Sequence, residues 1–87
     1  MEEVVAAEVK KIVQQACTPR FRLAVSFSPG QDIRNFTGRH DRATRIAAAL
    51  TTLARTYNAE ARILIIDIED CVTLQDIINL TLEVIND

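Results

Sequence analysis

A strict alternation of apolar and other side chains over residues 21–28 most constrains what this chain can fold into. Every second position is apolar, namely Phe21, Leu23, Val25 and Phe27, and the positions between them are Arg22, Ala24, Ser26 and Ser28. A period of two is typical of a β-strand that buries one face. We therefore predict a strand over residues 20–28, ended by the turn residues Pro29 and Gly30.

A second apolar segment, residues 61–68, differs from the first because its apolar residues are consecutive. The run Ile63-Leu64-Ile65-Ile66 is rich in β-branched side chains and too short for a typical helix, which predicts a central strand. Apolar residues recur with the period of a helix in three further segments, 2–16, 42–57 and 73–84. Thr73 is the predicted N-cap of the last helix, with Asp76 at its third position.

The order of these elements, α-β-α-β-α, predicts a small α/β or α+β fold. Two strands joined by a helix most simply form a right-handed parallel crossover, so we expect one small sheet with the helices packed mostly on one face. With 87 residues, of which 48% are hydrophobic, the chain fits a single domain over residues 1–87.

Charge and composition argue against several classes of function. Ten basic against twelve acidic residues leave a formal net charge of -2, so we expect no binding to nucleic acid or to an anionic membrane. No apolar run approaches the roughly 18 residues of a spanning helix, and the N-terminus lacks a basic signal-peptide region. The predicted location is therefore the cytoplasm. Two cysteines and one histidine argue against a structural metal site and a disulfide scaffold, and we predict no cofactor.

The only histidine, His40, directly precedes the second predicted helix. Free backbone N–H groups and the positive dipole end of a helix N-terminus favour a phosphate group there, and a neutral imidazole is a nucleophile near pH 7. We therefore predict that His40 is the catalytic nucleophile. Arg39 and Arg45 are predicted to bind the phosphate through their guanidinium groups. The alternative is that His40 is a solvated loop residue or helix cap, and that Asp41 pairs with the neighbouring arginines.

The segment Gly38-Arg39-His40-Asp41-Arg42, followed by an alanine-rich helix, resembles the active site of HPr, the histidine-containing phosphocarrier of the bacterial sugar phosphotransferase system. The family pattern is Gly-x-His-x-Arg-Pro-Ala at a helix N-terminus. The resemblance continues through residues 57–63 and 71–82. It implies that His40 accepts a phosphoryl group, that Arg42 steadies this group, and that donor and acceptor proteins of the phosphotransferase type are the partners.

The sequence departs from the HPr pattern at several points, which leaves other hypotheses open. Ala43 replaces the proline, and the family's fourth strand and last helix have no counterpart, so a permuted, truncated or degenerate relative is expected. An alternative is a non-catalytic interaction or dimerisation module without phosphotransfer. The helices and the long loop also resemble an acyl carrier protein. That family needs an Asp-Ser-Leu motif, whereas Asp41 is followed by Arg42 and Ala43, and the alternating segment argues against an all-helical bundle.

The last predicted helix is apolar on nearly every side, because Leu80, Leu82 and Val84 lie outside its main apolar face. A helix of this kind is either fully buried or docked on a partner. We predict that Ile77, Leu80 and Leu82 bind a protein partner or form a homodimer.

Overall fold

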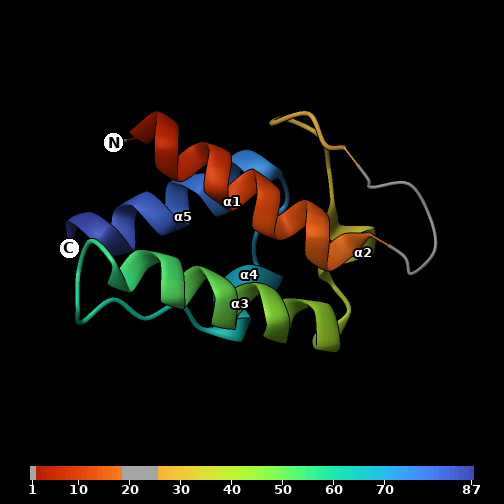
Figure 1. Ribbon diagram of the computed structural model, residues 1–87. Coiled ribbons are helices and arrows are strands. Elements are labelled where there is room, and N and C mark those ends of the chain that lie inside the picture. The colour runs from red at the N-terminus through yellow and green to blue at the C-terminus, as the bar shows by residue number, and fades with distance from the viewer. Residues whose placement is uncertain (1, 19–25) are drawn as a thin grey trace.

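Five helices make up most of the part of the chain that the computed structural model describes, residues 2–18 and 26–87 (Figure 1). Three of them are long: α1 (Glu2–Cys17), α3 (His40–Arg55) and α5 (Leu74–Asn86). Two are short: α2 (Arg34–Thr37) and α4 (Ile65–Glu69). The three predicted helical segments are thus confirmed, each within a few residues of its predicted bounds. None of the described helices is long and apolar enough to span a membrane.

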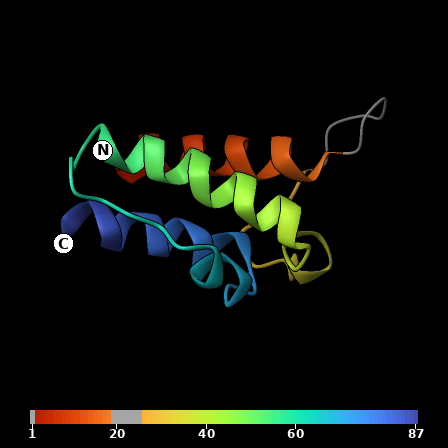
Figure 2. The same cartoon turned by 90° about the horizontal axis from the view of Figure 1, so that it is seen from below.

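The three long helices pack side by side as a bundle, in which α1 contacts both α3 and α5 (Figure 1, Figure 2). α3 also contacts α5, and α4 packs on α3. Spacings of three and four residues place the buried side chains of each helix on one face. The fully buried ones include Val5, Val9 and Val13 of α1, Ile46 and Leu50 of α3, and Leu74 and Ile77 of α5.

The predicted α/β or α+β fold with a small sheet is wrong, because the described residues contain no sheet. Within the described residues, backbone pairing of the β type is limited to one isolated antiparallel bridge, between Asp32 and Thr73. Of the first predicted strand, residues 19–25 lie outside the described part of the chain, and residues 26–28 are not in a strand. The parallel crossover and the HPr-like sheet architecture are therefore wrong as well.

The second predicted strand, residues 61–68, is replaced by an extended segment and then by α4. Asp67 Oδ2 accepts a hydrogen bond from the N–H of Leu64 at 3.2 Å, which favours the first turn of a helix. Within α4, Ile66 is 60% exposed, whereas Ile68 is fully buried. A strand would place these two residues on the same face, so the burial pattern is that of a helical turn.

α5 begins with the capping box predicted from Thr73 and Asp76. Thr73 Oγ1 accepts a hydrogen bond from the Asp76 N–H at 3.1 Å. Asp76 Oδ2 accepts hydrogen bonds from the N–H groups of Val72 and Thr73, each at 3.1 Å, and these contacts lower the pKa of the Asp76 carboxyl. The box pairs N–H groups that a helix leaves free at its N-terminus, and so determines where α5 begins.

The connection between residue 26 and α2 is attached to the bundle at both of its ends. Phe27 is buried, and its ring centroid lies 5.1 Å from that of Phe36, with the rings inclined at 57°. The Phe27 N–H donates to Gln14 Oε1 of α1 at 2.9 Å. The N–H of the buried Ile33 donates to the carbonyl oxygen of Val72 at 2.9 Å. The connection therefore joins α1 to the segment that leads into α5.

Candidate functional site

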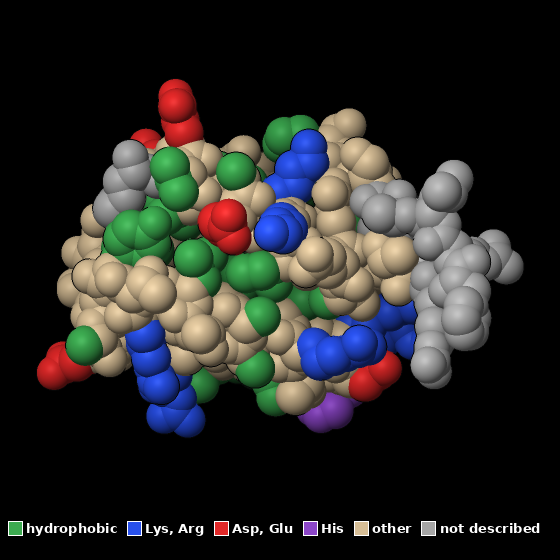
Figure 3. Space-filling model, viewed as in Figure 1, with side chains coloured by type: hydrophobic (Ala, Val, Ile, Leu, Met, Phe, Trp, Pro, Cys, Tyr) green, Lys and Arg blue, Asp and Glu red, His purple; other side chains and the backbone are tan. Residues whose placement is uncertain are grey.

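His40 is the first residue of α3, and its side chain is 80% exposed (purple in Figure 3). Its Nδ1 lies 3.6 Å from Oε1 of Glu69, at the end of α4. Arg39, at the N-cap, has an extended backbone and makes no side-chain capping hydrogen bond. The structure therefore places His40 at a helix N-terminus and beside a carboxylate.

Two of the arginines predicted to act with His40, Arg42 and Arg45, lie three residues apart and so share one side of α3. Residues two positions apart on a helix do not face each other, so Arg42 and His40 point in different directions. Arg45 lines a groove of about 380 Å³ on the α1 side of α3, with Ile12, Gln15, Ala16 and Ala49. Burial raises the pKa of the Cys17 thiol, while the charges of Arg42 and Arg45 act in the opposite direction. Both arginines thus lie near the end of α1.

The predicted partner-binding residues of α5 lie against the core of the bundle. Ile77 is fully buried, while Leu80 and Leu82 are partly buried and pack against the core. α5 contacts both α1 and α3, so apolar residues on more than one side of the helix find neighbours within the chain. Association through these three residues stays a prediction, and only parts of Leu80 and Leu82 are accessible to a partner.

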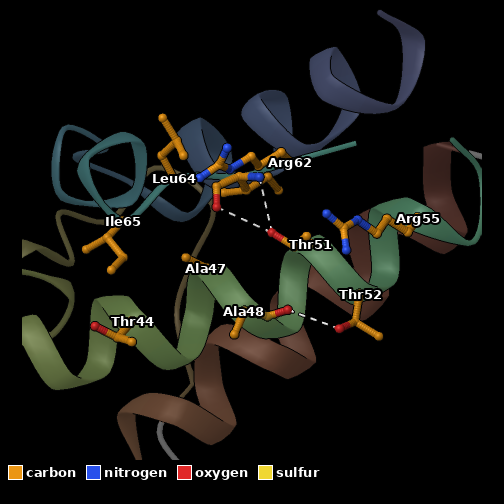
Figure 4. Close-up of a pocket in the computed structure, with 10 residues that line it drawn as sticks. Thr44, Ala47, Ala48, Thr51, Thr52, Arg55, Arg62, Leu64 and Ile65 are labelled. Carbon is orange, nitrogen blue, oxygen red and sulfur yellow. Dashed lines mark hydrogen bonds between the residues drawn. The ribbon is translucent and has the colours of Figure 1, made fainter. Parts of the chain in front are cut away.

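A groove of about 470 Å³ runs along α3 and the extended segment before α4 (Figure 4). It is lined by Thr44, Ala47, Ala48, Thr51, Thr52 and Arg55 of α3, and by Arg62, Ile63, Leu64 and Ile65. Thr51 Oγ1 accepts a hydrogen bond from the Ile63 N–H at 3.1 Å and lies 3.3 Å from the Ile63 carbonyl oxygen, to which it donates. Arg55 Nε donates to the carbonyl oxygen of Ala61 at 3.0 Å. Thr51 and Arg55 of α3 therefore form side-chain hydrogen bonds with the backbone of the extended segment. In a β-sheet, the backbone of a second strand would form such hydrogen bonds.

Two large apolar side chains remain exposed, one that lines this groove and one in α4, which follows it in the chain. Leu64, which lines it, is 42% exposed, and Ile66 in α4 is 60% exposed. Residues three and four positions apart share a side of a helix, so Ile66 lies on the same side of α4 as Glu69 and Asp70. The sequence interpretation missed this surface because it assigned residues 61–68 to a strand. Glu69 and Asp70 follow Ile66 by three and four residues, and this helical spacing is the sequence signal that could have indicated an exposed helical turn here.

Opposite charges lie at the two ends of the groove. Arg55, the last residue of α3, lines one end, and Arg62 also lines the groove (Figure 4). Beyond the other end, Glu69 reaches His40 at the start of α3. Asp41 precedes both Thr44, which lines the groove, and its ion-pair partner Arg45 by one turn, so it lies at the edge of the groove. Asp41 and Arg55 are separated by about 21 Å along α3, at about 1.5 Å per residue. We call this surface the α3–α4 face; it comprises Asp41, Thr44, Ala48, Thr52, Arg55, Arg62, Leu64, Ile66, Glu69 and Asp70.

Both cysteines, Cys17 and Cys71, are free and buried. Burial raises the pKa of the Cys71 thiol to about 11, and nearby carboxylates act in the same direction. A buried, protonated thiol is a poor nucleophile and a poor metal ligand. Within residues 2–18 and 26–87, no group of three or more His, Cys, Asp and Glu side chains is placed to hold a metal ion.

No family model matches this chain, and no curated protein or solved structure matches it either. The function is therefore inferred from the geometry of the site itself.

Proposed function

We propose that this protein is a non-catalytic interaction module that binds a protein partner through the α3–α4 face. The observation that carries the proposal is a pair of exposed apolar side chains: Leu64, which lines the groove, and Ile66, two residues further along the chain in α4. Removing apolar surface from water contributes about 25 cal/mol per Å². Exposed apolar patches bounded by polar residues are typical of protein–protein contact surfaces, and Arg62 and Glu69 bound this one.

The polar groups around the groove favour binding over catalysis. Thr51 exchanges hydrogen bonds with Ile63, Thr52 Oγ1 donates to the carbonyl oxygen of Ala48 at 3.1 Å, and Arg55 is bonded to Ala61. Throughout the described residues, every buried side-chain nitrogen or oxygen atom has a hydrogen-bond partner. Substrate pockets usually present a few convergent polar groups to their ligand. Here those groups already stabilise the fold.

A second candidate, a carrier of the acyl carrier type, is favoured by the order of the helices. A long first helix, a long connection and two further long helices agree with what that resemblance implies, and the expected sheet that argued against it is absent from the described residues. The attachment motif does not fit, since no serine follows Asp41, and the described serines Ser26 and Ser28 precede α2. Incubation with coenzyme A and a phosphopantetheinyl transferase should therefore leave the intact mass unchanged, whereas a gain in mass would support this candidate.

Phosphotransfer on His40 stays a prediction from the local motif alone. The architecture that accompanied it is wrong, and the Glu69 carboxylate, 3.6 Å from the imidazole, would repel a phosphoryl dianion on the ring. This hypothesis has less support than the interaction module.

Site-specific photo-crosslinking in cells that produce the protein tests the interaction module. A photoreactive amino acid replaces Ala48, an exposed residue of the α3–α4 face, and the matched control places it at Ala7, an exposed alanine of α1. We expect a discrete protein adduct from position 48 and none from position 7. The proposal fails if position 48 gives no adduct, or if both positions give the same one.

A further inference from the structure

We infer that the partner of the α3–α4 face is a second copy of this chain, bound about a two-fold axis with the two α3 helices antiparallel. The inference rests on the proposed function and adds the identity of the partner. The charge arrangement of the face carries it, because this arrangement is complementary to itself.

A two-fold axis through the middle of the face brings its opposite ends together. Arg55 and Arg62 form the basic end, and Asp41, Glu69 and Asp70 form the acidic end. In an isologous contact the same surface is used by both copies, so the basic end of each copy meets the acidic end of the other. A parallel arrangement would place like charges opposite each other, which is unfavourable.

The carboxylates at the acidic end are only weakly engaged within their own chain. Asp41 Oδ2 lies 3.9 Å from Arg45 Nη2, and the Glu69 contact with His40 measures 3.6 Å, all between substantially exposed side chains. Arg45 lines the groove on the α1 side. By contrast, the pair of Arg34 with Asp32 elsewhere on the surface is short, at 2.6 Å. Exposed ion pairs as long as the first two contribute little, so these carboxylates are available to the arginines of another copy.

Before Arg55, the residues of α3 that line the groove all have short side chains. Thr44, Ala48 and Thr52 occupy successive turns, and short side chains let two helix axes approach to about 8 Å. Leu64 lines the groove and Ile66 follows in α4, and an antiparallel second copy would cover both. The contact would thus bury Leu64 and Ile66 of both copies, the exposed apolar residues on which the proposed function rests.

Reciprocal charge reversal tests the antiparallel contact. Sedimentation velocity over a wide range of concentrations should show a monomer–dimer equilibrium for the unaltered chain. Arg62→Glu and Glu69→Arg should each raise the dimer dissociation constant by about tenfold or more, because each homodimer then opposes like charges at two places. Mixing the two variants should restore dimerisation, since both contacts between unlike chains regain opposite charges. Lys11→Glu and Glu83→Arg, at exposed positions of α1 and α5, carry the same changes of net charge and should have no effect.

Each other outcome overturns the inference. A monomer at every concentration, or a dimer that neither reversal weakens, shows that this face does not bind a second copy. Weakening without restoration in the mixture excludes the antiparallel arrangement. If crosslinking from position 48 captures a different protein, the interaction module stands and the homodimer is wrong. If position 48 gives no adduct with any protein, the proposed function fails as well.

Discussion

Replacing Ile68 by alanine should destabilise the protein far more than the same replacement at Ile66. The two residues lie in the same short helix, α4, yet Ile68 is fully buried and Ile66 is 60% exposed. The substitutions are chemically identical and gain the same helix propensity. The difference between them therefore measures burial alone.

The expected magnitude follows from the carbon atoms removed. Isoleucine to alanine deletes three carbons, which contribute about 2.4 kcal/mol when fully buried, at about 0.8 kcal/mol each. At Ile68 a cavity adds to this loss, so the total falls in the range of about 3 to 4 kcal/mol. At Ile66, where less than half of the side chain is covered, the transfer loss is about 1 kcal/mol and solvent fills the space. The two variants should differ by about 2 to 3 kcal/mol.

Urea unfolding followed by circular dichroism, at a protein concentration where the chain is monomeric, measures both free energies of unfolding. The difference corresponds to about 10 to 20 °C in Tm for a domain of this size. If Ile68→Ala does not fold, Ile68→Val and Ile66→Val keep the comparison, with expected losses of about 1 kcal/mol and about zero. Equal losses at the two positions would show that both residues lie on one buried face, as in the strand, and would contradict the helical assignment of residues 65–69.

The remaining predictions concern the cap, the thiol and the histidine. Thr73→Ala should lower the free energy of unfolding by about 1 kcal/mol, measured by the same urea titration, because the Asp76 N–H loses its acceptor. The pKa of Asp76 is lowered from 3.8 in the folded state by backbone hydrogen bonds. The ionised Asp76 carboxylate therefore contributes its full stabilisation above pH 3.8, and this stabilisation is lost as the pH falls through the lower folded-state pKa. In Asp76→Asn, the free energy of unfolding should fall less steeply as the pH is lowered. Cys71, with a thiol pKa raised to about 11, should react with a thiol reagent at pH 8 only after urea unfolds the chain; rapid reaction of the folded protein would contradict its burial. Incubation with a phosphoenolpyruvate-dependent phosphotransferase should add no mass, whereas acid-labile phosphate that disappears in His40→Ala would revive the phosphocarrier hypothesis.

The sequence by itself determined the three long helices and the start of α5. Apolar spacings of three and four residues, such as Val5, Val9 and Val13, specify which side of a helix is buried regardless of what covers it. The capping box of Thr73 and Asp76 likewise involves groups only three residues apart. Contacts of this range depend on local chemistry, and local chemistry is visible in the sequence.

Only the tertiary structure decided residues 61–68 and the α3–α4 face. A short β-branched run is compatible with a strand or with a buried helical turn, and periodicity cannot separate them. A strand needs the backbone of a neighbour, but the neighbour here is α3, whose Thr51 hydroxyl takes the hydrogen bonds of Ile63. The contact of Glu69 with His40, and the groove that Arg62 lines, likewise exist only because the chain after residue 61 packs on α3. Periodicity reports which side of an element is covered, whereas the groups that cover it come from distant parts of the chain.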